Sequence, residues 1–302
     1  MACQRKIAVL GASGLLGKAI FNRFCKEPGG AEGVFAIPWS EIGVPDVGAD
    51  LHHLESYLEK KLGDLSAVDF VIANGLIGSA DIDQLMYSNL EFPRNLIRAV
   101  WRHAGSRFVT FGTIHERFFA ARSHNPYFMS KYSLSQWISE FDAQYPLTHR
   151  ILHLRLHTLY GLPLHPRMFL WQIAEALKSN TPFRMSSGEQ LREYHHVDDI
   201  AECVCRLCRK QWNWEPILEI NSGEAMRLKD LAAAIFREFN REHLLLIGDI
   251  PAGEGENKSE IFNRTNDGIL PSSRKPLAGV IDTLRQYLNM DASPGRENTP
   301  NP

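Results

Sequence analysis

Short apolar runs alternate with longer amphipathic stretches through the first half of the 302-residue chain. The runs have the length of strands, whereas the stretches between them repeat apolar residues at helical spacing. The expected strands are Lys6–Gly11, Val34–Pro38, Asp69–Asn74, Arg107–Thr113 and Arg150–Leu156, and the expected helices are Leu15–Cys25, Leu51–Lys61, Asp83–His103 and Pro126–Tyr145. This alternation predicts an α/β fold in which right-handed strand–helix–strand units build a doubly wound parallel sheet.

The regularity fades after Gly161. There the pattern predicts helices at Arg167–Leu177, Leu228–Asn240 and Leu277–Leu288, a short strand at Pro216–Gly223, a loop at Pro251–Ser273 and a disordered tail. We therefore expect a sheet domain over residues 1–160, a smaller lobe over 161–290 with segments that return to the core, and a tail over 291–302. Ligands of open α/β sheets bind at the carboxyl edge of the sheet, so the lobe is expected to shape a substrate site there.

Composition narrows the class of partner. The apolar share of 44% and the charged share of 23% are those of a globular protein, and a formal charge of -2 gives no bulk attraction to nucleic acid or anionic membrane. No run of about twenty apolar residues occurs, and the apolar start of the chain is too short for a secretory signal. A small-molecule partner and a cytoplasmic location are expected.

Cysteine and histidine clusters raise the question of metal binding. The cysteines number five, an odd count that does not suggest a disulfide framework. Cys203, Cys205 and Cys208 lie in a helical pattern near its apolar face, so core packing is expected for them. The pairs His195–His196 and His52–His53 consist of adjacent residues, which cannot easily share one ion. No metal site is expected.

The sequence VLGASGLLGKAI places Gly11, Gly14 and Gly17 directly after the first strand and at the start of the first helix. In a dinucleotide-binding turn the first glycine permits the turn, the second lets a pyrophosphate approach the backbone, and the third allows close helix–strand packing. We expect Ser13, Leu15 and Leu16 to contribute to the same turn.

The second strand carries information on the nicotinamide cofactor. NAD-binding turns usually meet an acidic residue about twenty residues further on, where it binds the ribose 2′-hydroxyl. Here the chain reads VFAIPWSEIG, with no well-placed carboxylate and with Ser40 in reach of a phosphate. The pattern favours NADP and leaves NAD open.

The segment NPYFMSK holds Tyr127 and Lys131 four positions apart on one helical face, about 6 Å along the axis. A free phenol has a pKa near 10, and a neighbouring ammonium lowers that value, which would make Tyr127 an acid or base tuned by Lys131. Thr113 ends the strand RFVTFGT at the carboxyl edge, where its hydroxyl can hold a substrate oxygen.

From Lys6 to about Asn240, these motifs resemble in matching order the extended short-chain dehydrogenase/reductases, in their nucleotide-sugar epimerase/dehydratase branch. Besides the glycine turn and the Tyr-x-x-x-Lys helix, VIANG resembles the strand motif that lines the cofactor, LRLHTLYGL the segment after strand six, and GEQLREYHHVDDIAECV the stretch that links the substrate lobe back to the core.

The resemblance implies roles for individual residues. Thr113 takes the place of the active-site Ser/Thr, Tyr127 that of the acid/base, and Lys131 that of the anchor of the cofactor ribose. Ala73, Asn74 and Gly75 would line the cofactor. For the nucleotide-sugar substrate we expect contacts from His115, from Thr158 and from Arg192, the last at the nucleotide diphosphate; His115 could equally be a histidine bonded to backbone.

Two departures from the family pattern bear on the reaction. Dehydratases of this branch carry Asp-Glu directly after the threonine, whereas this chain has Ile114 and His115. The short span between strands two and four is similar to that of sugar-nucleotide 4-ketoreductases. The sequence thus favours an NADP-dependent ketoreductase, and it leaves open an NAD-dependent 4-epimerase and a non-catalytic dinucleotide sensor. The resemblance also implies a homodimer through the helices of Asp83–His103 and Pro126–Tyr145.

Overall fold

The structure is a computed structural model that describes residues 5–27, 30–42, 50–77, 81–118, 125–145, 149–166, 168–253 and 274–291. Most of the expected loop Pro251–Ser273 and the expected tail lie outside the described residues. The chain divides into two compact units. The first comprises the described residues of Met1–His157 and Val197–Asn221, and the second those of Thr158–His196, Ser222–Arg264 and Ser272–Pro302.

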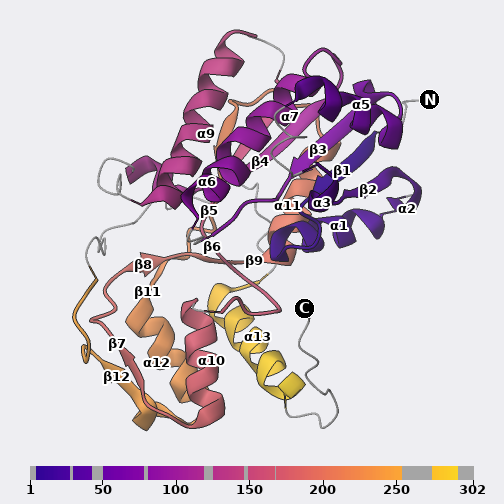
Figure 1. Ribbon diagram of the computed structural model, residues 1–302. Coiled ribbons are helices and arrows are strands. Elements are labelled where there is room, and N and C mark those ends of the chain that lie inside the picture. Colours follow the sequence, from indigo (N-terminus) through magenta and orange to yellow (C-terminus); the bar gives the residue numbers. More distant parts are fainter. Residues whose placement is uncertain are drawn as a thin grey trace. The chain divides into compact units, whose positions relative to one another are not determined.

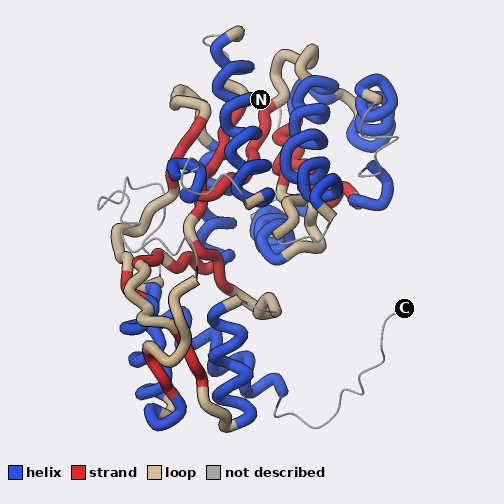
Figure 2. Tube along the Cα trace, turned by 60° about the vertical axis from the view of Figure 1, so that its left-hand side comes forward, coloured by secondary structure: helices blue, strands red, loops and turns tan. Residues whose placement is uncertain are grey.

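A parallel sheet of six described strands forms the centre of the first unit (Figures 1 and 2). In spatial order the strands are β10 (Ile217–Glu219), β5 (Ile151–Leu156), β4 (Arg107–Thr113), β3 (Val68–Ile72), β1 (Lys6–Leu10) and β2 (Val34–Ile37). The strands form where apolar runs occur, and β3 is buried along its whole length. The prediction of a doubly wound parallel sheet is confirmed.

Helices cover both faces of this sheet (Figure 1). One face carries α1 (Leu15–Cys25) and α11 (Val197–Arg209), which pack against each other; the other carries α5 (Leu51–Leu62), α7 (Phe92–Val100) and α9 (Pro126–Ala143). Shorter helical segments are α2 (Gly30–Gly33), α3 (Trp39–Ile42), η1 (Leu65–Ala67), α6 (Ile82–Met86), η2 (Tyr87–Glu91) and η3 (Ile114–Phe118). The main apolar core lies between the sheet and the helices α5, α7 and α9.

The expected helix Asp83–His103 is interrupted. Its middle, η2, is a π-helix between α6 and α7. The extra residue per turn brings Asn89 to the loop after β3, where its Oδ1 accepts the Leu76 N–H (2.8 Å) and its Nδ2 donates to the Ser130 hydroxyl on α9 (3.1 Å). The π-helix thereby ties that loop to α9, and such segments are frequent at functional sites.

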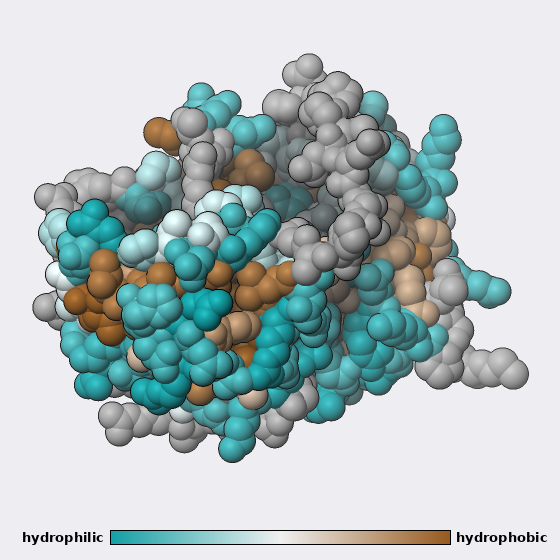
Figure 3. All heavy atoms as spheres, turned by 90° about the horizontal axis from the view of Figure 1, so that it is seen from below, coloured by the Kyte–Doolittle hydropathy of each residue, from teal (hydrophilic) through white to brown (hydrophobic). Residues whose placement is uncertain are grey.

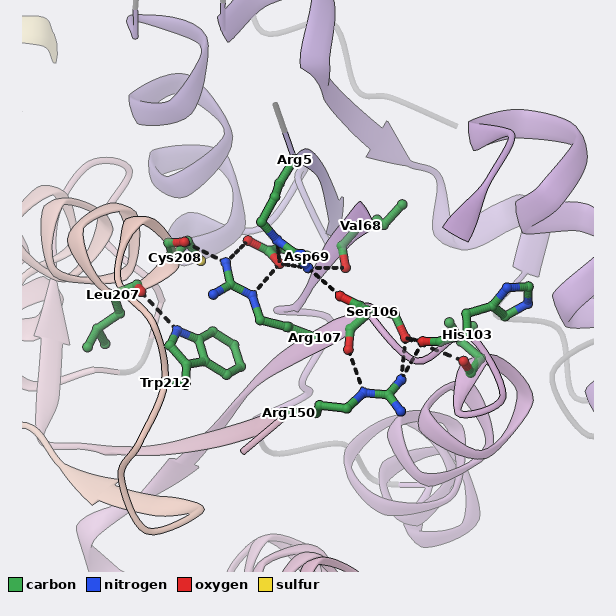
Figure 4. A network of polar contacts seen from close by, with 12 residues as sticks. Arg5, Val68, Asp69, His103, Ser106, Arg107, Arg150, Leu207, Cys208 and Trp212 are labelled. Atoms are coloured by element: carbon green, nitrogen blue, oxygen red, sulfur yellow. Dashed lines mark hydrogen bonds and ion pairs between the residues drawn. The ribbon is translucent and has the colours of Figure 1, made fainter. Parts of the chain in front are cut away.

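A buried polar network closes the amino edge of the sheet (Figure 4). Asp69, which is 1% exposed, accepts hydrogen bonds from the Nε atoms of Arg5 and Arg107, each at 2.7 Å. Arg107 also donates to the Lys210 carbonyl (2.9 Å) just after α11. Three strands and one helix are thus joined at the edge opposite the glycine turn.

The second unit has its own apolar core, built from α10 (Phe169–Ser179), α12 (Leu228–Glu238) and α13 (Pro276–Asp291). Its strands form three short pairs: β6 (Thr158–Tyr160) with β9 (Tyr194–His196), β7 (Phe183–Met185) with β12 (Leu245–Ile247), and β8 (Leu191–Arg192) with β11 (Met226–Arg227); η4 (Glu242–Leu244) precedes β12. The space-filling view from below shows apolar residues gathered among hydrophilic ones (Figure 3). Among the described residues, no helix is both long and apolar enough to cross a membrane.

Candidate active site

The glycine turn joins β1 to α1 at the carboxyl edge of the sheet. Gly11 has a φ of 80°, and a Cβ there would lie 2.6 Å from the Ala73 carbonyl group. A Cβ on Gly17 would lie 2.1 Å from the Gly11 carbonyl oxygen. Only glycine therefore allows the turn to approach the end of β3 and α1 to pack on the turn.

The start of α1 fits a phosphate group. Gly14 is the N-cap residue, and no side chain caps the helix there. A Cβ added to Gly14 would have one atom within 4 Å, the Gly11 carbonyl oxygen at 3.4 Å. Ser13 and Gly14 are exposed, and Leu15 and Leu16 are half-buried. No acidic residue lies in the first turn of α1. An open, uncapped helix N-terminus suits the pyrophosphate of a dinucleotide.

Ala73, Asn74 and Gly75 follow β3 beside this turn. The Ala73 N–H donates to the Leu10 carbonyl (2.9 Å), which fixes the segment to β1. The Asn74 Nδ2 donates to the Ser88 carbonyl (3.2 Å), whereas its Oδ1 is buried and has no hydrogen-bond partner among the described residues. This acceptor is consistent with the contact to a bound cofactor that the sequence predicts for Asn74.

Ser40 lies in α3 directly after β2 and is exposed. The carboxylate of the next residue, Glu41, accepts hydrogen bonds from Lys61 Nζ (3.0 Å) and from the Tyr57 hydroxyl. Because two donors on α5 already bind Glu41, its carboxylate is not positioned as a free acceptor for a ribose hydroxyl.

Tyr127 and Lys131 lie in the first two turns of α9. Asn125 caps this helix by accepting the Tyr127 N–H (2.9 Å), and Pro126 occupies the first helical position. Lys131 is 7% exposed, its Nζ donates to the Phe111 carbonyl (2.9 Å), and it would lie 2.8 Å from a Cβ on Gly75. The absence of a side chain on Gly75 thus leaves room for the ammonium group.

The protonation of the pair differs from the expectation that Lys131 lowers the pKa of Tyr127. Burial, and after it the Glu116 carboxylate, raise the pKa of Tyr127 well above its ordinary value. Burial lowers the pKa of Lys131 to about 8, although Glu116 opposes this shift. Desolvation outweighs the attraction between neighbouring charges here, so Tyr127 is protonated at neutral pH.

Thr113 ends β4 and is buried. Its Oγ1 accepts the His115 N–H at 3.4 Å, and the His115 ring packs edge-on against Phe128 of α9, with centroids 5.0 Å apart. His115 therefore lies between Thr113 and helix α9, which carries Tyr127. Its backbone N–H contacts Thr113, and its ring contacts α9.

Three polar residues behind Thr113 were missed by sequence reasoning: Glu116, His153 and Arg155. Glu116 lies in η3, and the other two lie on β5. Glu116 Oε1 accepts the Thr113 N–H (2.8 Å), and Glu116 Oε2 accepts the Nε–H of Arg155 (2.8 Å). The signal in the sequence is the polar alternation of HLR in an otherwise buried strand.

Thr158 and Arg192, the other expected substrate contacts, lie in the second unit. The Thr158 N–H donates to the Glu193 carbonyl (3.1 Å), which brings β6 beside the residue after Arg192. Arg192 is half-buried, and its guanidinium donates to the Leu191 carbonyl (2.8 Å). The structure thus assembles Thr113, Tyr127 and Lys131 in one unit and Thr158 and Arg192 in the other.

The cysteines considered for metal binding are buried, and one further group of possible metal ligands is already paired. Cys203, Cys205 and Cys208 are buried in α11, and burial raises the pKa of each thiol. Within the described ranges one group, formed by Glu55, Glu59 and His103, has suitable ligand atoms close together. The guanidinium of Arg102 already pairs with both of its carboxylates.

The doubly wound sheet, the glycine turn and the Tyr-x-x-x-Lys helix beside Thr113 define a protein of the extended short-chain dehydrogenase/reductase type. Residues 7–220 match the sequence profile described as "NAD dependent epimerase/dehydratase family". The chain belongs to this family. No curated protein matches the sequence significantly.

Solved structures share the fold at low sequence identity. A dTDP-glucose 4,6-dehydratase from Bacillus anthracis str. Ames, in complex with NAD, is 13% identical, with a TM-score of 0.72 over 95% of this chain and 98% of that one. A UDP-glucuronic acid 4-epimerase from Bacillus cereus, in complex with UDP-glucuronic acid and NAD, is 16% identical, with a TM-score of 0.72 over 94% and 99%. A GDP-D-glycero-L-gluco-heptose synthase from Campylobacter jejuni, in the presence of NADPH, is 14% identical, with a TM-score of 0.71 over 96% and 99%.

Proposed function

We propose that the protein is an NADP-dependent reductase of a keto group on a nucleotide-activated sugar. The observation that carries this proposal is the presence of Thr113, Tyr127 and Lys131 in the unit that holds the glycine turn, with Lys131 bonded to β4 and placed against the segment after β3. One protein of similar fold, the UDP-glucuronic acid 4-epimerase, is in complex with UDP-glucuronic acid, which supports this substrate class.

Thr113, Tyr127 and Lys131 have different roles in carbonyl reduction. The chemistry that a nicotinamide cofactor supplies when bound is hydride transfer to carbon. Tyr127 holds the proton that the carbonyl oxygen must receive, because its raised pKa keeps the phenol neutral. The Thr113 hydroxyl polarises the same oxygen, and Lys131 holds the ribose of the cofactor.

The preference for NADP rests on the end of β2. Ser40 is exposed there, and Glu41, the nearest acid, is bound to Lys61 and Tyr57. A free carboxylate at the end of β2 would bind the ribose 2′-hydroxyl of NAD and repel the 2′-phosphate of NADP. Because Glu41 binds Lys61 and Tyr57 instead, the site favours NADP over NAD.

An NAD-dependent 4-epimerase is the second candidate, since the same three residues would serve it and one similar structure is a 4-epimerase with NAD. An epimerase retains its cofactor through the cycle, so purified protein would carry tightly held NAD. Dehydration is not supported, because Ile114 is buried and apolar where dehydratases of this branch carry an acid. The adjacent Glu116 does not replace it, since its oxygens bind Thr113, His153 and Arg155.

A non-catalytic dinucleotide sensor is the third candidate, and the intact set of Thr113, Tyr127 and Lys131 is the feature against it, because a binding module has no use for a proton donor beside the nicotinamide. A homodimer through α6, α7 and α9 remains part of the proposal.

The test is a titration of the purified protein with NADPH and NADH, followed by NADPH oxidation against a panel of nucleotide 4-keto sugars. We expect tighter binding of NADPH and its consumption with at least one keto sugar. Copurified NAD without net consumption would establish the epimerase instead. Binding of NADPH without turnover of any sugar would support the sensor.

A further inference from the structure

A buried carboxylate lies directly behind the candidate catalytic threonine. Glu116 is 2% exposed and follows Thr113 by three residues, so that its side chain folds back to accept the Thr113 N–H at 2.8 Å. His153 is fully buried, and its Nε2 lies 3.3 Å from each carboxylate oxygen. The Arg155 Nε completes the set at 2.8 Å.

Strands β4 and β5 leave space for the Glu116 side chain. In the β4–β5 register Thr110 pairs with His153 and Gly112 pairs with Arg155, so these four positions share one face of the sheet. A Cβ on Gly112 would lie 2.1 Å from Glu116 Oε1 and 2.2 Å from His153 Nε2. Glycine at this position therefore makes the space that the carboxylate and the imidazole occupy.

The hydrogen bonds define the protonation of the cluster. Burial alone would raise the pKa of Glu116, but the combined effect of His153, Arg155 and the Thr113 N–H holds it below its ordinary value. The ionised carboxylate only accepts hydrogen bonds, so the His153 Nε2 carries a proton. The Nδ1 of His153 lies 2.8 Å from the Thr110 hydroxyl.

The charge of Glu116 reaches the catalytic helix. Helix α9 packs against η3, and the negative charge raises the pKa of both Tyr127 and Lys131. Among the described residues, the other titratable or charged groups around Glu116 are His115 and Arg117 on η3, His153 and Arg155 on β5, and Glu219 on β10. Glu219 pairs with Arg117 at 3.1 Å and approaches Arg155 to 3.6 Å.

We propose that Glu116 is a positioning residue of this active site, which fixes the backbone of Thr113 through its N–H and places a permanent negative charge behind Tyr127 and Lys131. For its catalytic consequence this inference rests on the proposed function. A Glu116 carboxylate whose charge is cancelled by Arg155 and His153 would hold these residues in place without affecting protonation on α9.

The decisive variant is Glu116→Gln, which keeps an oxygen for the Thr113 N–H and removes the charge. The full-length protein, labelled with carbon-13 at the lysine ε-carbons, is titrated by NMR, and the Lys131 signal is assigned by its loss in Lys131→Met. We expect the Lys131 midpoint to fall by about one pH unit relative to wild type. Glu219→Gln removes the carboxylate that pairs with Arg117 and approaches Arg155 from the side away from Glu116, and it is expected to leave the midpoint within about 0.3 units.

Turnover provides the second readout. In Glu116→Gln the alkaline decline of the reduction rate should move to lower pH by about one unit, which is about a tenfold loss on that flank, because Lys131 loses its ammonium proton at lower pH. If Glu116→Gln does not fold, the double variant Glu116→Leu with His153→Leu replaces the two fully buried partners by apolar side chains, while Arg155 keeps the Glu219 carboxylate at 3.6 Å, and the same fall of the Lys131 midpoint is expected.

An unchanged Lys131 midpoint in the folded variant would overturn the inference, whatever the enzyme does with sugars. The lysine titration needs neither cofactor nor substrate, so a wild-type protein that turns over no nucleotide sugar would count against the proposed function alone.

Discussion

At the scale of single residues, the site combines a protonated tyrosine with a lysine whose ammonium is easily lost. Burial shifts both groups: it raises the pKa of Tyr127 above a value at which the phenol is already protonated at neutral pH, and it lowers that of Lys131 to about 8. The sequence predicted the pair and its spacing on one helix. It could not predict Glu116 as a neighbour of both, because the partners of that carboxylate, His153 and Arg155, lie on another strand 37 and 39 residues away.

Replacement of Tyr127 by Phe removes the proton donor and keeps the ring. We expect turnover to fall by about 10²- to 10⁴-fold, the usual contribution of a positioned acid, while the dissociation constant of NADPH changes less than about twofold. Steady-state kinetics and fluorescence titration measure the two effects. Tyr132→Phe, on the same helix, is the control and should keep nearly full turnover. Retention of most activity in Tyr127→Phe would exclude the tyrosine as the acid.

Lys131 makes stability depend on pH. Its pKa is about 8 in the folded chain and about 10.4 in the unfolded chain, so the unfolded chain binds more protons between these values. Stability relative to Lys131→Met should therefore rise with pH across this window, by at most about 3 kcal/mol. Urea denaturation at several pH values measures the difference, in which the opposing contribution of the three buried thiols cancels. A difference that stays constant with pH would show that Lys131 is not desolvated.

At the scale of elements, the strands and long helices follow the apolar periodicity closely, since each buries one face against the sheet. The apolar periodicity does not predict the π-helix η2, because the pattern of this stretch is also that of a regular α-helix. Tyr87, Ser88 and Asn89 are buried there. Its role in tying the loop after β3 to α9 depends on the tertiary contacts of Asn89.

The glycine turn makes a prediction that separates binding from folding. Gly14→Ala adds a Cβ with one ordinary contact, to the Gly11 carbonyl oxygen at 3.4 Å, so it should cost less than about 1 kcal/mol of stability and still weaken NADPH binding at least about tenfold by blocking the approach of the pyrophosphate. Gly17→Ala places its Cβ 2.1 Å from the Gly11 oxygen and should cost about 3 kcal/mol or more. Calorimetry and NADPH titration test both. Normal binding by Gly14→Ala would remove the turn from the cofactor site.

The amino-edge network should matter for stability and not for binding. Asp69→Asn leaves the guanidinium groups of Arg5 and Arg107 without their carboxylate, and we expect a loss of about 3 kcal/mol in the free energy of unfolding with unchanged NADPH affinity. Arg206→Ala, which breaks an exposed pair with Glu202, is the control and should cost about 0.5 kcal/mol or less. A loss for Asp69→Asn as small as that of the control would contradict a clamping role.

At the scale of the whole molecule, the chain leaves the sheet unit after His157 and returns to it at Val197. The returning segment supplies α11 and the edge strand β10, which pairs with β5 in parallel. A single sequence shows the two regions as a change from regular to irregular patterning. It does not show which later segments pair with earlier strands, because strand pairing is decided by the register of backbone hydrogen bonds across distant residues.

The proposed reaction is hydride delivery to a sugar carbonyl with proton donation from Tyr127. The most direct measurement is incubation of the protein with NADPH deuterated at the transferable position of the nicotinamide and a nucleotide 4-keto sugar, followed by mass spectrometry and NMR of the sugar. We expect one deuterium on the former carbonyl carbon for each NADPH oxidised, and about 10²-fold or slower incorporation by Tyr127→Phe. A sugar without deuterium, together with NADPH that is not oxidised, would contradict the proposed reductase activity.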